Sequence, residues 1–300
     1  IAEPQLEYQA VLGKGKISLL AGTSFQEITS SSSTISASNY SSDMLLGSVS
    51  GAGTVTAENS RGQYRYAAVF GRVNYQLSEK YLVNLTGRRD GSSRFGPGRQ
   101  FAHFGAAGLG WIFSKEAFFQ RNFRWLSFGK IRFSYGLTGN DQIGDYQYLD
   151  SWTATSSTYL GISTLQPSRL YNPDYSWEEN RKTELGLELG LLRDRVLFTL
   201  NYFQNRSGNQ LVNYSLPIQT GFSSIGRNLP ALIQNKGIEA ELSAKLLQTK
   251  KINWQAAIHL TIPRNKLVDF PGLSGSTYAN TYIIGEPVSA RLRYEFLGVD

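Results

Sequence analysis

The chain has 300 residues, no cysteine and a formal net charge of +7, and 41% of its residues are hydrophobic. Without cysteine it forms neither disulfides nor thiolate metal sites, and its scattered basic residues argue against nucleic-acid binding. No run of about 18 apolar residues exists, which excludes a transmembrane helix. This criterion does not exclude a transmembrane β-barrel, because the lipid-facing residues of a barrel strand alternate with polar ones.

Alternation of apolar and polar residues predicts amphipathic β-strands along most of the chain. Residues 184–191 alternate glutamate or glycine with leucine, and residues 195–204 place Val196, Phe198 and Leu200 on one face. The clearest segments have about the length that a tilted strand needs to cross a bilayer. The predicted strands are residues 6–12, 16–26, 64–77, 80–89, 103–113, 127–138, 182–191, 195–204, 237–247, 252–261 and 290–298.

Short and long connections alternate between these strands, so the protein has two unlike ends. The short turns are residues 13–15, 77–80, 192–194 and 248–251, with the longer 114–125 on the same side. The long polar loops are residues 27–63, which contain a serine tract expected to be mobile, 90–102, 139–179, 205–236 and 263–289. Such loops are unusual in a compact domain but normal on the outer rim of a membrane barrel. We therefore expect an all-β fold, a transmembrane antiparallel β-barrel with short periplasmic turns and long extracellular loops.

Aromatic residues gather near the short-turn side, and they predict a girdle of rings at the membrane interface. The alternative is ordinary core packing in a soluble β-sandwich, but the rings stand at strand ends rather than in mid-strand. These residues are Phe118, Phe119, Phe123, Trp125 and Phe128, with Tyr75 and Tyr81 near another turn.

The long loops also carry aromatic residues, interleaved with asparagine, aspartate and glutamine. Ring faces that stack and amides that donate hydrogen bonds suit the recognition of sugars or peptides. The alternative is that these rings pack the loops against one another or against a partner. The candidate contacts are Tyr146, Tyr148, Trp152, Tyr159, Tyr171 and Trp177, with Tyr175 nearby.

No catalytic, cofactor or metal site is predicted. Asp141, Asp145 and Asp150 do not have the spacing of a calcium loop and are expected to be solvated. The glycines from residue 105 to 110 lack the order and the context of a dinucleotide-binding loop. An outer-membrane enzyme would need His103 or His259, and neither lies in a nucleophile motif.

One string of residues carries a family resemblance. It reads Arg88-Arg89-Asp90-Gly91-Ser92-Ser93-Arg94-Phe95-Gly96, with Tyr81-Leu82-Val83-Asn84 before it and Gly110-Trp111-Ile112-Phe113 after it. Further matching segments are residues 114–119, 130–140, 172–173, 177–178, 216–222, 235–239 and 284–287. In this order the segments closely resemble the SusC/RagA family of TonB-dependent outer-membrane transporters of Bacteroidetes. Two departures are Gly105, where the family has proline, and residues 262–266, where it has an asparagine-rich segment.

The resemblance implies a segment of a 22-stranded barrel with a plugged lumen in the cell outer membrane. Residues 1–300 would be a partial barrel domain, with the N-terminal plug, the TonB-contacting segment and the closing C-terminal strands outside it. It further implies a SusD-like lipoprotein partner, contact with outer-membrane lipid, and TonB-energised import of oligosaccharides or peptides without covalent chemistry. A passive porin or structural barrel is the alternative.

The physical interpretation of residues 88–95 is structural. Asp90, Gly91 and Ser92 supply turn conformations after a strand, and Arg88 and Arg94 can pair with carboxylates inside the rim. We expect the motif, including Arg89, Ser93 and Phe95, to hold the loop and to face the plug rather than to bind cargo.

Overall fold

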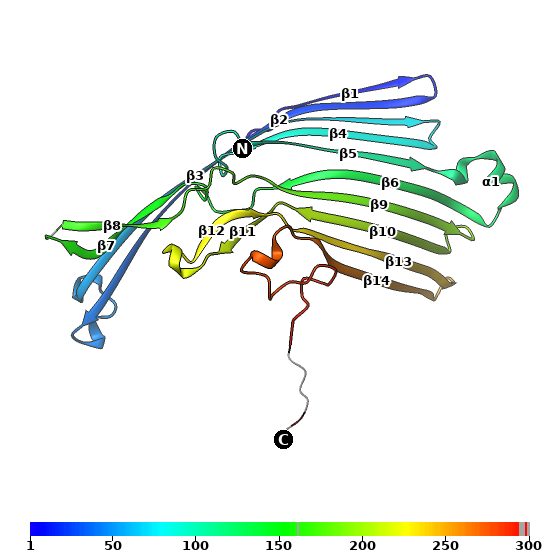
Figure 1. Ribbon diagram of the computed structural model, residues 1–300. Coiled ribbons are helices and arrows are strands. Elements are labelled where there is room, and N and C mark those ends of the chain that lie inside the picture. The colour runs from blue at the N-terminus through cyan, green and yellow to red at the C-terminus, as the bar shows by residue number, and fades with distance from the viewer. Residues whose placement is uncertain (161, 294–297, 299–300) are drawn as a thin grey trace.

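The computed structural model describes residues 1–160, 162–293 and 298, and its main feature is one curved antiparallel sheet (Figure 1). The ten strands of this sheet follow one another in chain order, so each pairs with its nearest neighbours along the sequence. They are β1 (Gln5–Leu12), β2 (Gly15–Tyr40), β3 (Ala52–Leu77), β4 (Tyr81–Ser92), β5 (Phe101–Trp111), β6 (Leu126–Asn140), β9 (Glu178–Leu191), β10 (Val196–Gly208), β13 (Leu232–Gln248) and β14 (Asn253–Asp269).

The remaining elements lie in the connections. Two small hairpins pair β7 (Ser151–Tyr159) with β8 (Ile162–Arg169) and β11 (Gln210–Ser215) with β12 (Ser224–Leu229). The helix α1 (Ala117–Asn122) lies between β5 and β6. Short 3₁₀ turns occur at Asp43–Leu45, Val49–Gly51, Phe113–Lys115, Ile218–Thr220 and Leu273–Gly275. Among the described residues, no helix is both long enough and apolar enough to cross a membrane.

The sheet has the two unlike ends that the sequence predicts. The tight turns and α1 lie together at one end, and the small hairpins lie at the other (Figure 1). The turn after β9 is narrow because Leu192, Arg193 and Asp194 all adopt positive φ angles of 53–59°, which give a chain reversal with the twist that hairpins prefer. We call these the turn end and the loop end.

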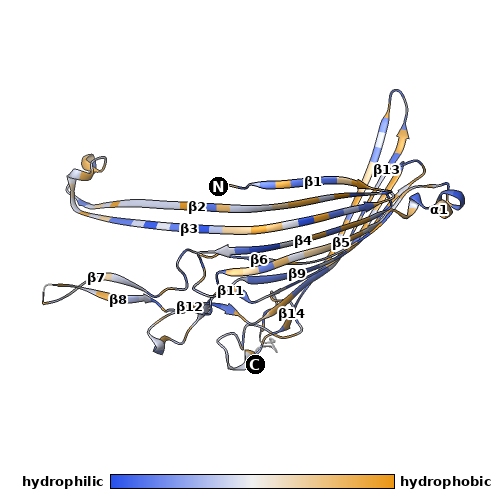
Figure 2. Ribbon diagram, turned by 90° about the horizontal axis from the view of Figure 1, so that it is seen from above, coloured by the Kyte–Doolittle hydropathy of each residue, from blue (hydrophilic) through white to orange (hydrophobic). Residues whose placement is uncertain are grey.

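Strand register places the apolar side chains of neighbouring strands on the same face. Leu187 lies opposite Ile131 of β6 and Leu200 of β10, whereas Glu188, one residue later, lies opposite Lys130. Alternating hydropathy is visible along the strands in Figure 2. The sheet therefore has one apolar face and one polar face, as a barrel wall between lipid and a wet lumen requires.

The aromatic residues of the turn end form a continuous chain of rings. Centroid distances between neighbouring rings are 5.0–6.5 Å, and the chain runs through Trp111, Phe113, Phe119, Phe118, Phe123 and Trp125. Phe118 is 64% exposed and Trp125 is 52% exposed. Rings this accessible suit an interfacial girdle rather than the buried core of a sandwich.

The prediction that residues 27–63 form a loop is wrong for residues 27–40 and 52–63, which are strand. β2 and β3 continue past the rest of the sheet, and their register extends to Tyr40 opposite Ala52 (Figure 1). Serine and threonine dominate this extension, yet Ser30–Ser33 pair residue by residue with β3. Cross-strand hydrogen bonding, which composition alone does not reveal, orders the segment.

The end of the chain also differs from expectation. Residues 263–269 continue β14 instead of forming a loop, and Pro263 within this stretch lies opposite Gly237 of β13. The predicted strand at residues 290–298 is absent where the structure describes it, at residues 290–293 and 298. Residues 294–297 of that prediction lie outside the described residues.

Candidate functional site at the loop end

The motif at residues 88–95 forms the junction between β4 and the loop that follows it. Arg88 donates from Nε to Asp90 Oδ1 at 2.8 Å, and both side chains lie on the polar face. Asp90 is only 6% exposed, and Arg88 also donates to the Tyr66 hydroxyl. The predicted pairing of Arg88 with a carboxylate is thus present, and the partner belongs to the motif.

Two other motif residues, Arg89 and Gly91, contact the Phe101 ring on the apolar face. The guanidinium of Arg89 lies 4.7 Å from the centroid of the Phe101 ring. Gly91 lies opposite Phe101, and a Cβ atom at this position would collide with the ring. Glycine at residue 91 is therefore needed for the close approach of Phe101.

A polar network joins the motif to the long loop at residues 139–179. The Ser92 hydroxyl donates to Asp141 Oδ2 at 2.7 Å, and the Tyr64 hydroxyl donates to the same oxygen at 2.9 Å. Arg94 donates from Nε to Asp145 Oδ1 at 3.0 Å, and its guanidinium lies 4.2 Å from the centroid of the Tyr64 ring. Asp141 and Asp145 are therefore bonded within the protein, which corrects the expectation that they are solvated.

An aromatic core lies beside this network. The Phe95 side chain is fully buried, with ring centroids at 5.2 Å to Trp177 and 6.2 Å to Tyr175. Trp177 also contacts Phe104 at 5.4 Å, and its indole N–H donates to the Gln100 carbonyl at 2.9 Å. Burial raises the pKa of the Tyr175 phenol. We call Phe95, Phe104, Tyr175 and Trp177 the rim core.

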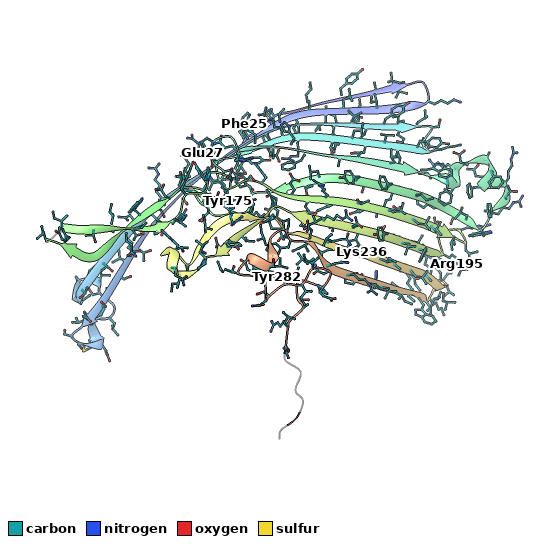
Figure 3. All side chains as sticks on the ribbon, viewed as in Figure 1. Phe25, Glu27, Tyr175, Arg195, Lys236 and Tyr282 are labelled. Atoms are coloured by element: carbon teal, nitrogen blue, oxygen red, sulfur yellow. The ribbon has the colours of Figure 1, made fainter. Side chains whose placement is uncertain are left out.

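The predicted loop contacts fall into two groups. Trp177 is 7% exposed and belongs to the rim core, and Tyr148 is half-buried with its ring packed closely over Gly96. The other four are accessible: Tyr146 is 40% exposed, Trp152 58%, Tyr159 72% and Tyr171 53%. Trp152 and Tyr159 lie on the β7–β8 hairpin, which extends away from Tyr175 of the rim core (Figures 1 and 3).

The described residues offer no metal or catalytic centre. No group of three or more histidine, aspartate or glutamate residues within that part of the chain could hold a metal ion. Asp150, the third loop aspartate, accepts a hydrogen bond from the Trp152 indole at 3.3 Å. His103 lies opposite Arg89 on the apolar face, and His259 lies opposite Glu241 on the polar face, so the two histidines cannot share a site.

A charged network crosses the polar face between β6 and β10. Lys130 pairs with Glu188 at 3.3 Å, Arg132 pairs with Glu188 at 3.4 Å and with Glu184 at 3.5 Å, and Arg132 also donates to Asn201 Oδ1 at 2.7 Å. Opposite charges on neighbouring strands would have revealed this network in the sequence, once the register was known. Beside it lies a pocket of about 250 Å³, lined by Arg132, Glu184, Asn201, Phe203, Asn205 and Glu239.

The sequence matches the family described as "TonB dependent receptor-like, beta-barrel" over residues 3–298, nearly the whole chain. The chain belongs to this family. The predicted family and the predicted all-β barrel architecture are thereby confirmed, and the TonB-dependent receptor barrel is placed in the outer membrane. TonB-dependent receptors are transporters rather than enzymes.

Several curated TonB-dependent receptors are similar to this barrel segment. Receptor P26 of Formosa agariphila is 30% identical over 318 residues, covering 99% of this chain and 31% of the relative. The receptor SusC of Bacteroides thetaiotaomicron is 30% identical over 219 residues, covering 70% of this chain and 21% of SusC. The chain thus spans about a third or less of the length of the relatives that it matches.

Solved structures of TonB-dependent receptors show the same arrangement of strands. The RagAB peptide transporter matches with a TM-score of 0.83 and 26% identity, over 95% of this chain and 32% of that one. The ferric-catecholate import receptor Fiu of Escherichia coli matches with a TM-score of 0.54 and 12% identity, over 89% of this chain and 38% of that one. The second likeness concerns the fold alone.

Loss of the Asp141 carboxylate should loosen the loop at residues 139–179. In the Asp141→Ala variant, the buried Ser92 hydroxyl and the Tyr64 hydroxyl lose their acceptor, at a cost of about 1–3 kcal/mol. Limited proteolysis of the folded receptor should cut this loop faster. The matched control is Asp174→Ala, which removes the exposed 2.9 Å ion pair with Arg99 and should cost about 0–1 kcal/mol. Equal cleavage rates in the two variants would contradict the assigned role of Asp141.

Proposed function

We propose that the full-length protein imports oligosaccharides or peptides across the outer membrane, with energy supplied through TonB. The observation that carries this proposal is the match to the RagAB peptide transporter over 95% of the chain, at a TM-score of 0.83. We further propose a SusD-like surface lipoprotein as the partner that covers the loop end. The similarity to SusC supports the same assignment.

We infer that the ten-stranded sheet is one arc of a larger barrel. β1 and β14 each have one edge that pairs with no other strand of the described structure, and open edges are not tolerated inside a bilayer. The other strands, the plug and the TonB-contacting segment belong to the remainder of the receptor in this proposal. The Arg132 network would then face the plug, because it lies on the polar face.

For cargo contact we propose the accessible loop aromatics, above all Trp152 and Tyr159 on the β7–β8 hairpin. Their rings are exposed by more than half and can stack on a sugar or on a peptide side chain. Trp177, whose ring and N–H are both engaged in the rim core, would act by holding the loop in place. Residues 88–95 would have the same supporting role.

Uptake measurements on cells that express the full-length receptor test the transport proposal. A strain that lacks the receptor gene should fail to take up a labelled oligosaccharide pool or a labelled peptide pool, and the wild-type gene should restore uptake of one of them. Restoration should require TonB, since transport against a gradient needs an energy source. Uptake that is undiminished without TonB would instead support a passive porin.

The Trp152→Ala variant should lower uptake about three- to tenfold, because one stacked ring contributes about 1 kcal/mol to binding. The matched control is Trp125→Ala, since Trp125 is similarly exposed (52% against 58%) but lies at the turn end, where its carbonyl accepts from the Leu192 amide. Uptake should be measured at equal amounts of folded receptor. If the two variants transport equally well, Trp152 has no part in cargo binding, while the TonB-dependent uptake of the wild type is unaffected by that result.

A further inference from the structure

Five cations occupy neighbouring positions on the apolar face at the loop end. Register aligns them in two rows, Lys236 beside Arg264, and Arg181 beside Arg206. Lys266 continues the second row, because Gln234 lies between it and Arg206. Figure 3 marks Lys236 within the sheet, and Arg195 at the turn end of β10 for comparison. We call Arg181, Arg206, Lys236, Arg264 and Lys266 the cation patch.

Like charges directly opposite each other on adjacent strands destabilise a sheet. Both Lys236–Arg264 and Arg181–Arg206 are such pairs, and all five side chains are exposed. In the part of the chain that the structure describes, only Arg181 of the five has an ion-pair partner, Glu179 at 3.4 Å. Arg206 donates from Nε to the Gln234 side-chain oxygen at 3.1 Å, a hydrogen bond to a neutral group that leaves its charge uncompensated. The patch therefore carries an excess of positive charge that an anion from outside the chain would neutralise.

Two cations on other strands at this end contact partners on their own or neighbouring strands and do not belong to the patch. Arg65 of β3 pairs with Glu27 at 3.3 Å, and Arg89 of β4 lies over the Phe101 ring. The charge of the patch is carried by β9, β10, β13 and β14, which are adjacent in the sheet. Four adjacent strands about 4.8 Å apart make a strip about 15 Å wide.

The patch also lies at a consistent height on the wall. Ten residues separate the turn-end apolar residue from the cation on each of the four strands: Leu191 and Arg181, Val196 and Arg206, Leu246 and Lys236, Trp254 and Arg264. At about 3.4 Å per residue and a tilt of about 40°, ten residues rise about 25 Å. This matches the height of the apolar band of an outer-membrane barrel, so the cations reach the headgroups of the leaflet at the loop end.

We propose that the cation patch binds the phosphates of a phosphorylated glycolipid, of the lipid A type, in the outer leaflet. Guanidinium groups hold phosphate through paired, charge-assisted hydrogen bonds, and Lys236 and Lys266 add point charges. The apolar side chains below, including Ile238 and Ile262, lie where the acyl chains of the same lipid would pack. The loop end faces outward in this family of barrels. The leaflet that it meets is the outer one, whose phosphate-bearing lipid is a glycolipid. The site is independent of the transport proposal.

Native mass spectrometry of the purified full-length receptor with added bisphosphorylated lipid A tests this site. The Lys236→Gln/Arg264→Gln variant should bind lipid A at least about tenfold more weakly than wild type, because two charged contacts are lost. The matched control is Lys250→Gln/Lys251→Gln, which removes two exposed cations from the turn end of the same hairpin. The control should bind lipid A as wild type does.

Two further lipids make the test independent of how well the variants fold. Wild-type receptor should lose about tenfold in affinity for lipid A from which both phosphates have been removed, and it should bind phosphatidylglycerol at least as weakly. Retained binding of the dephosphorylated lipid, or equal binding of phosphatidylglycerol, would overturn the proposal. So would an equal loss of lipid A binding in the patch variant and the turn-end control.

Discussion

The Phe95→Ala variant is expected to destabilise the loop end by about 3–5 kcal/mol, the usual cost of removing a buried aromatic ring. Phe95 is the largest side chain at zero exposure in the described structure. Its removal leaves a cavity against Trp177 and Tyr175, which the surrounding strands cannot fill without losing their register. The loop at residues 139–179 should become sensitive to protease, and the full-length receptor should unfold at a lower denaturant concentration.

The matched control for this experiment is Phe118→Ala. Phe118 is the same residue type, but it is 64% exposed and lies at the turn end. Its truncation should cost less than about 1 kcal/mol, since most of the ring surface lies outside the protein core and little of it is buried on folding. A Phe95→Ala receptor as stable and as protease-resistant as Phe118→Ala would show that the rim core does not support the loop end.

The Phe198→Lys variant is expected to impair assembly of the barrel by roughly 1–2 kcal/mol, the cost of a lysine on the lipid face between the midplane and the turn-end interface. Phe198 lies on the apolar face, directly opposite Leu189 of β9 and Leu242 of β13. A lysine there has no carboxylate partner and must extend toward the headgroups. The measurement is the fraction of receptor that folds into lipid vesicles, read from its altered mobility in unheated gel electrophoresis.

The neighbouring position provides the control. Thr199 lies on the polar face, opposite Glu188 and Glu241, so the lysine of Thr199→Lys meets two carboxylates instead of lipid. We expect this variant to fold as efficiently as wild type. If both lysine variants assemble equally well, the assignment of the two faces to lipid and lumen is wrong.

Most of the wall of the barrel can be predicted from local sequence. Alternation at residues 184–191 depends only on neighbouring residues, and it places Leu187 and Glu188 on the faces where the structure has them. The turns after β3 and β9 are predictable for the same reason. The motif at residues 88–95 indicates the family, because its order of residue types is specific over a short stretch.

The loop end is harder to predict, since its order depends on partners that are distant in sequence. Residues 27–40 form a strand because residues 52–65 pair with them, although their serine-rich composition indicates a loop. Sequence alone groups Trp177 with the exposed ligand-binding rings, yet Phe95 and Phe104, more than 70 residues earlier, bury it. Asp141 and Asp145 likewise have no local partner in the sequence, and only folding brings them to Ser92 and Arg94.

The amino-acid sequence thus determines which face of each strand meets lipid, where the chain turns, and to which family it belongs, because period-two alternation and short motifs are local. The tertiary structure alone decides which loop residues are buried and which stay accessible, since burial follows from contacts between distant segments. The cation patch shows the same division. Each of Arg181, Arg206, Lys236 and Arg264 is an ordinary strand-end cation in sequence, and only the register of four strands makes them one site.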